Sequence, residues 1–171
     1  MRRTRRLLIS LLAITAFAAA ASAQESHTSE TDDYSIEFPS ETWKAVPRAD
    51  SARRLAEFIY GERSDGYLRV RKEVVEGNTS LSEFARTEQD TKLRFLPAFV
   101  GGKEERFTGR LGGIVNTYEY TSGGKPMAGR VYYLQADSRT VYALHFTGSL
   151  KKLERIQNQT DAIARSFKLK Q

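Results

Sequence analysis

Three β-strand patterns follow one another between residues 113 and 147: GIVNTYEYT (113–121), MAGRVYYLQA (127–136) and RTVYALHFT (139–147). The first connection contains a pair of glycines, Gly123-Gly124, and the second consists of Asp137-Ser138. Short connections of this kind, rich in glycine or in small polar residues, are typical of β-hairpins. The segment therefore predicts a three-stranded antiparallel meander.

The chain before the meander supplies further strands. Residues 34–38, YSIEF, alternate apolar and polar side chains up to Pro39. Residues 54–60 and 67–75 form a second predicted hairpin, because glycines bracket the connection GERSDG. Alternating polarity along 67–75 favours an antiparallel sheet. A short strand is also expected over 103–110.

Two helices are expected, one before and one after the meander. Ser80 can cap the first helix, with Glu83 completing a capping box, and Pro97 sets its latest end. The second helix opens at Gly148-Ser149, and spacings of three and four residues give it one apolar stripe, formed by Leu150, Leu153, Ile156, Ile163, Ala164 and Phe167. The pattern predicts an α+β fold, a central antiparallel β-sheet flanked by helices on both faces.

The amino terminus has the three parts of a secretory signal peptide. Four arginines in the first six residues precede an uncharged run over 7–21, and Ala21-Ser22-Ala23 supplies the small residues of a cleavage site. We expect cleavage between Ala23 and Gln24. Because a run of 15 residues is shorter than the ~20 needed to cross a bilayer, no integral membrane span is expected after cleavage. We expect residues 24–33 to form a flexible polar leader and residues 34–171 to form one domain.

The overall charge of +6 overstates how basic the mature chain is. Four of the 27 basic residues lie in the predicted signal peptide, which contains no acidic residue, so 23 basic and 21 acidic residues remain. A net charge of +2 argues against nucleic acid as a partner. The absence of cysteine excludes disulfides and thiolate metal sites.

The mature chain resembles the PsbP-like family. The resemblance lies in Tyr34-Ser35-Ile36-Glu37-Phe38-Pro39 followed by Trp43, in the tyrosine-rich hairpin and in the ending Ile163-Ala164-Arg165-Ser166-Phe167, and it spans about residues 34–169. It implies an α/β/α sandwich with a central antiparallel sheet. It also implies docking onto other macromolecules rather than catalysis, and it carries over no cofactor, metal or partner-binding residue.

Two groups of side chains are candidates for an interaction surface. Tyrosines crowd the meander, and each offers apolar area together with a hydroxyl; those singled out are Tyr118, Tyr120, Tyr132 and Tyr133. The same tyrosines would also serve as ordinary strand residues packed beneath helices. Basic residues on the last helix, Lys151, Lys152 and Arg155, could meet an acidic partner, although a solvated helix face explains them equally well.

Catalytic signals are sparse. His145, the one histidine in the predicted domain, could act as a general base or could simply be a strand residue satisfied by a neighbour. Adjacent carboxylates Glu104 and Glu105 would point to opposite faces of a strand. The sequence thus predicts an exported, non-catalytic module that docks onto an envelope protein. The alternative is a periplasmic protein with a small-ligand pocket between sheet and helices, lined by the tyrosines.

Overall fold

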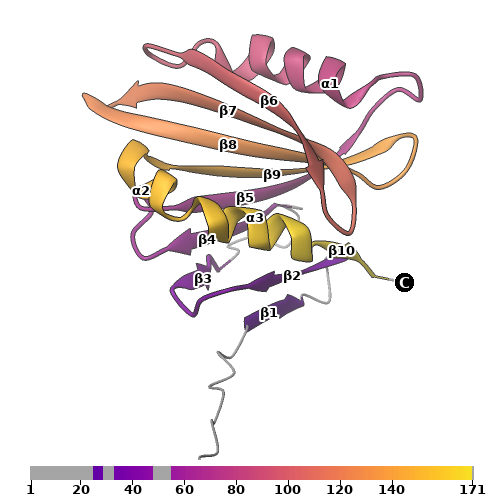
Figure 1. Cartoon of the computed structure of the whole chain (residues 1–171), viewed down its shortest axis with the longest axis horizontal. Helices are drawn as coiled ribbons and strands as arrows, with labels where there is room; N and C mark the ends of the chain where they lie inside the picture. The colour runs from indigo at the N-terminus through magenta and orange to yellow at the C-terminus, as the bar shows by residue number, and fades with distance from the viewer. Residues whose placement is uncertain (1–24, 29–32, 48–54, 171) are drawn as a thin grey trace, which may run out of the picture.

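The computed structural model describes residues 25–28, 33–47 and 55–170, and most of them belong to antiparallel sheet (Figure 1). The larger sheet has seven strands in the order β3-β4-β5-β9-β8-β7-β6. Their bounds are Trp43–Ala45 (β3), Ala56–Tyr60 (β4), Tyr67–Val74 (β5), Val100–Thr108 (β6), Gly112–Ser122 (β7), Lys125–Gln135 (β8) and Thr140–Ser149 (β9). The predicted meander is confirmed as β7-β8-β9, and the predicted earlier hairpin as β4-β5.

A smaller sheet of three strands has the order β1-β2-β10. It joins the predicted strand β2 (Tyr34–Phe38) to β1 (Glu25–Thr28) and to β10 (Lys168–Leu169) near the carboxyl end of the chain. β1 falls within residues 24–33, the segment expected to be a flexible leader, and it pairs antiparallel along β2. The edge of β2 opposite β10 offers the unpaired backbone groups that make this pairing favourable.

The first helix begins where the sequence predicts. In α1 (Leu81–Glu88) the Ser80 Oγ accepts a hydrogen bond from the Glu83 backbone N–H at 3.2 Å. The helix continues into η1 (Gln89–Leu93), a π-helical turn that ends before Pro97.

The last helix is divided in two, which the apolar stripe does not reveal. Its parts are α2 (Leu150–Arg155) and α3 (Gln157–Ser166). Ile156, between them, has φ of −99° and ψ of 12°, away from helical values, while its side chain is buried in the core. The break lets both halves keep their apolar positions against the same core.

Buried side chains form two clusters on opposite sides of the larger sheet, because successive strand residues point to opposite sides. The first face is defined by the aromatic cluster that includes Phe58, Leu68, Tyr132, Tyr142, Leu144 and Phe146. Residues of α2, α3 and β2 join that cluster. The second face is defined by Tyr118, Val131, Tyr133, Val141 and Ala143, which pack with Ala85 of α1.

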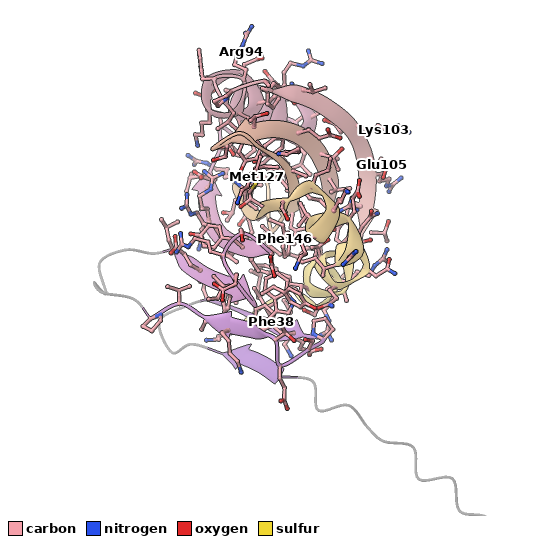
Figure 2. The ribbon with its side chains drawn as sticks, turned by 90° about the vertical axis from the view of Figure 1, so that its left-hand side faces the viewer. Phe38, Arg94, Lys103, Glu105, Met127 and Phe146 are labelled. Carbon is pink, nitrogen blue, oxygen red and sulfur yellow. The ribbon has the colours of Figure 1, made fainter. Side chains whose placement is uncertain are left out.

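The figures place these layers in space. In Figure 1, α2 and α3 cross in front of the larger sheet and α1 lies along its β6 side. Figure 2 shows Phe146 and Phe38 inside the molecule, whereas Lys103 and Glu105 project outward from β6. Within the described residues, no helix is both long and apolar enough to span a membrane.

Candidate ligand-binding site

The structure does not gather the four predicted tyrosines on one surface. Tyr132 lies in the first-face cluster, whereas Tyr118 and Tyr133 lie in the second-face cluster, and all three are buried. Tyr120 is half-buried beside Tyr118, with ring centroids 5.8 Å apart. Their placement matches the alternative in which tyrosines pack beneath helices, and only Tyr120 keeps part of its ring at the surface.

Tyr132 fixes the last helix to the sheet. Its hydroxyl donates to Asp161 at 2.5 Å and lies 3.0 Å from the Thr160 hydroxyl. Arg130 donates to the same Tyr132 oxygen at 2.6 Å and to Asp161 at 3.0 Å. Burial, followed by the hydrogen bond to Asp161, raises the pKa of Tyr132 above its ordinary range. These hydrogen bonds from β8 to Thr160 and Asp161 hold α3 against the sheet.

The predicted basic residues form a separate, exposed group on α2. Lys151 and Arg155 are exposed, and Lys152 donates to Asp65 at 3.0 Å. Because Leu153 and Ile156 turn toward the core, the basic side chains occupy the solvent side of this helix.

A pocket of about 220 Å³ opens on the second face beyond the end of α1. It is lined by Tyr67, Arg69, Leu93, Leu96, Tyr118, Tyr120, His145 and Thr147. Strands β5, β7 and β9 supply the polar and aromatic residues. The two leucines are Leu93, the last residue of η1, and Leu96, three residues after it. The pocket thus combines an apolar wall with a polar floor, as small-molecule sites do.

A glycine sets the geometry of that floor. Tyr118 on β7 is opposite Gly129 on β8, and a Cβ at Gly129 would lie only 2.4 Å from the Tyr118 hydroxyl oxygen. The missing side chain lets the Tyr118 ring cross β8, so that its oxygen reaches His145 Nε2 on β9 at 2.6 Å. This close approach is the usual reason for glycine inside a strand.

The environment keeps His145 uncharged. Burial, together with the positive charge of Arg71, lowers the pKa of His145 to about 4. Burial raises the pKa of Tyr118 well above its ordinary range. At neutral pH both groups are therefore neutral hydrogen-bonding partners, and the ring of His145 carries one N–H donor.

The charged side chains at the pocket lie on its β4-β5 side. The Tyr67 hydroxyl and Arg69 Nε, the latter at 3.3 Å, both donate to Glu57 Oε1. Arg63 Nη2 lies 3.9 Å from Glu57 Oε2, with its guanidinium 4.4 Å above the Tyr67 ring. The hydrogen bond from Tyr67 lowers the pKa of Glu57, and the charge of Arg69 lowers it further. Two guanidinium groups thus face one carboxylate.

Closer to α1 on the same face, two basic and two acidic side chains pair with one another. Glu88 of α1 is buried and accepts from Arg71 Nη2 at 2.5 Å and from Lys92. Arg71 Nη1 also donates to Glu73 at 2.6 Å. Burial alone would raise the pKa of Glu88, but the hydrogen bonds from Arg71 and Lys92 hold it below its ordinary value.

Sequence reasoning identified Tyr118, Tyr120 and His145 but missed the other pocket residues. Arg69 lies in the alternating segment 67–75, and that pattern by itself gives it no role. Its place beside His145 depends on the pairing of β5 with β9, in which these two residues are directly opposite each other. Gly129, in the middle of a strand pattern, was the one signal that could have indicated a close approach across β8.

A second, larger groove of about 290 Å³ lies where β6, β7 and β8 meet α2. Its lining includes Val100, Gly101, Ala128, Leu150 and Leu153. Three charged side chains, Glu119, Arg130 and Glu154, also line it. Its apolar residues are continuous with the first-face core.

The adjacent carboxylates of β6 do not form a site. Glu104 Oε1 accepts from the Ser82 hydroxyl of α1 at 2.6 Å, whereas Glu105 points outward on the solvent side (Figure 2). The two carboxylates diverge, as expected for neighbours on a strand.

No protein-family model matches the sequence, and no curated protein matches it. Solved structures do resemble it. A protein from Bacteroides thetaiotaomicron superposes with a TM-score of 0.57 at 8% identity, over 85% of this chain and 48% of that protein. The chain therefore spans about half the length of that protein.

Two further structures match over almost their whole length. Cyanobacterial PsbP from Synechocystis sp. PCC 6803 superposes with a TM-score of 0.54 at 15% identity, over 91% of this chain and 97% of that chain. LpqN, involved in cell envelope biogenesis of Mycobacterium tuberculosis, superposes with a TM-score of 0.53 at 14% identity, over 87% and 92%. The PsbP-like resemblance inferred from the residues is confirmed at the level of the fold.

Proposed function

We propose that this chain is an exported, non-catalytic PsbP-like domain that acts as an accessory module in the cell envelope. Removal of residues 1–23 between Ala23 and Gln24, which lie outside the described residues, would release it in the periplasm or outside the cell. Residues 34–171 would then form one domain with the α/β/α sandwich arrangement. Its partner would be a protein of the envelope.

The observation that carries this proposal is the match to PsbP and LpqN over most of the length of each chain. The alignments include 91% and 87% of this chain and leave little of either neighbour unmatched. An accessory role also fits LpqN, which is involved in cell envelope biogenesis. Because fold alone does not determine function, the proposal depends on a direct test.

The solvent side of α2 is the surface we propose for docking. Lys151 and Arg155 are exposed there, and Lys152 is held by Asp65. A partner with an acidic surface would complement these charges, which at the rim of an interface act mainly on association rate and specificity.

Crosslinking and co-purification of the tagged full-length protein from its native envelope fraction test the proposal. We expect one dominant partner near equal stoichiometry, and we expect the double variant Lys151→Glu/Arg155→Glu to lose it. The matched control is Arg86→Glu/Lys125→Glu, which reverses two exposed charges elsewhere and should retain the partner. A partner-free monomer, or equal recovery with both double variants, would contradict the proposal.

A second candidate function is small-ligand binding, favoured by the second-face pocket of about 220 Å³. Its lining of tyrosines, leucines and a neutral histidine resembles a ligand site in composition. Ligand binding and docking are compatible, since no residue of α2 lines the pocket.

A further inference from the structure

We propose that the second-face pocket binds an aromatic monocarboxylate, with its ring among Tyr118, Tyr120 and the two leucines and its carboxylate on Arg69. The inference rests on the second candidate function and adds the chemical class of the ligand. It depends on three properties of the pocket: its size, its walls and its charge.

The size limits the ligand to about one ring with a substituent. The pocket holds about 220 Å³, below the ~300–1,000 Å³ of sites for drug-sized molecules. At ~30 Å³ for each water, this space corresponds to about seven waters. A monocyclic acid fits these limits, whereas a nucleotide or a long acyl chain does not.

The side chains that form the pocket walls favour a ligand with a flat, apolar ring. Tyr118 and Tyr120 present neighbouring rings at an interplanar angle of 31°, and Leu93 and Leu96 approach from the segment that follows α1. Aromatic rings stack in offset or edge-to-face arrangements at centroid separations of ~4.5–7 Å. A planar ring can therefore contact aromatic faces on one side and leucines on the other.

The arginines beside the pocket favour a negatively charged ligand. Arg69 and Arg63 share one carboxylate, Glu57. In the neighbouring group, Arg71 and Lys92 are balanced by Glu73 and Glu88. Among the ion pairs of the described residues, this end of the second face therefore has one more positive charge than negative charges. Hydrogen bonds within the described residues use two of the five N–H donors of Arg69, one to Glu57 and one to the Tyr67 hydroxyl.

Arg69 is also placed to reach a ligand carboxylate. Its side chain is 42% exposed and lines the pocket directly, so an anion can reach it without leaving solvent completely. A planar guanidinium binds carboxylates with paired hydrogen bonds, which makes an arginine contact stronger and more directional than a neutral one.

The test uses benzoate and its neutral analogue benzamide as probes. Each is titrated at pH 7, to about 10 mM, into the mature protein carrying ¹³C-labelled tyrosine and histidine rings. We expect saturable benzoate shifts confined to Tyr67, Tyr118, Tyr120 and His145, with benzamide at least tenfold weaker. The close match in shape between the two probes isolates the contribution of the carboxylate.

Variants assign the binding to the proposed atoms. Arg69→Gln should weaken benzoate at least tenfold and leave benzamide unchanged, whereas Thr147→Phe should fill the pocket and weaken both probes. The control Arg86→Gln removes an exposed arginine of α1 outside the pocket and should bind benzoate as the parent does. Thermal unfolding of each variant establishes that it is folded.

The outcomes separate the two levels of the inference. Equal binding of benzoate and benzamide, or an unchanged Arg69→Gln variant, would overturn the carboxylate assignment while leaving the pocket as a ligand site. Absence of shifts with both probes would overturn the ligand class and the second candidate function together. The accessory role is decided separately by co-purification.

Discussion

The two faces of the larger sheet are built on different principles. On the first face, aromatic rings meet in a continuous layer, with Phe146 near Tyr132 and Trp43, and α2 and α3 close over it. On the second face, α1 covers only part of the sheet, and ionised or hydrogen-bonding side chains fill the rest. The first face therefore contributes mainly stability, while the second has the chemistry suited to binding.

The comparison also explains where the pocket lies. Near α1, Glu88 neutralises Arg71, so polar groups are buried there with their partners. Beyond the end of α1, His145, Arg69 and Thr147 line the pocket, and Leu93 at the end of η1 and Leu96 after it form one of its walls. A pocket forms where the covering helix is shorter than the sheet beneath it.

The largest effect should come from the first face. Phe146→Ala removes a fully buried ring and should lower the free energy of unfolding by about 3–5 kcal/mol. Phe84→Ala, on α1, removes a partly buried ring that packs edge-on against Tyr133, and should cost about 1–2 kcal/mol. Denaturant unfolding measures both values. Equal losses would mean that the two faces contribute alike to stability.

Measuring stability as a function of pH should isolate the contribution of His145, which lies on the second face. The unfolded chain protonates His145 near pH 6.5, but the native pKa is about 4, so the unfolded state binds more protons between these values. Stability should therefore fall as the pH drops from about 6.5 to about 4, by up to about 3 kcal/mol from this group.

His145→Gln is the matched control for the titration and should flatten that part of the stability curve. Glu88 acts in a different range: its native pKa is depressed, so its contribution is present above about pH 4.3 and is lost as the pH falls through the lower native value. An unchanged slope between pH 6.5 and 4 in His145→Gln would assign the titration to other groups.

Gly129→Ala should disturb the pocket floor without touching the first-face core. The new Cβ would lie 2.0 Å from Tyr118 Cζ, so the ring must move away from His145, at a cost of about 1–3 kcal/mol. Loss of the Tyr118–His145 hydrogen bond would appear as a change in the His145 ring resonances. In a Tyr118→Leu background the same substitution should cost less; a cost that does not change would show that the Tyr118 ring is not the obstacle.

The smallest expected difference compares one tyrosine from each face. Tyr132→Phe leaves Asp161 and Arg130 without a shared buried partner and should cost about 1–2 kcal/mol. Tyr118→Phe removes one hydrogen bond to a neutral histidine beside a pocket and should cost about 0.5–1 kcal/mol. Denaturant midpoints measured side by side test the order, and a reversed order would contradict the division of roles between the faces.

Local patterns in the sequence were sufficient for much of the fold. Period-two alternation gave the strands of the meander. The same alternation along residues 139–147 places Val141 and Ala143 on the opposite face from Tyr142, Leu144 and Phe146. The Ser80 cap was equally readable, because a cap depends on neighbours three residues away. Such features depend only on residues that are close together in the sequence, so the sequence alone predicts them.

The site required the tertiary structure. Arg69 and His145 are 76 residues apart and meet only because β5 pairs with β9 in one particular register, since a shift by one residue would turn them to opposite faces. The division of the last helix at Ile156 and the short reach of α1 likewise follow from packing against the whole sheet. The sequence alone therefore determined which side chains each strand turns to one face, while the pairing of distant strands decided which of them share a pocket.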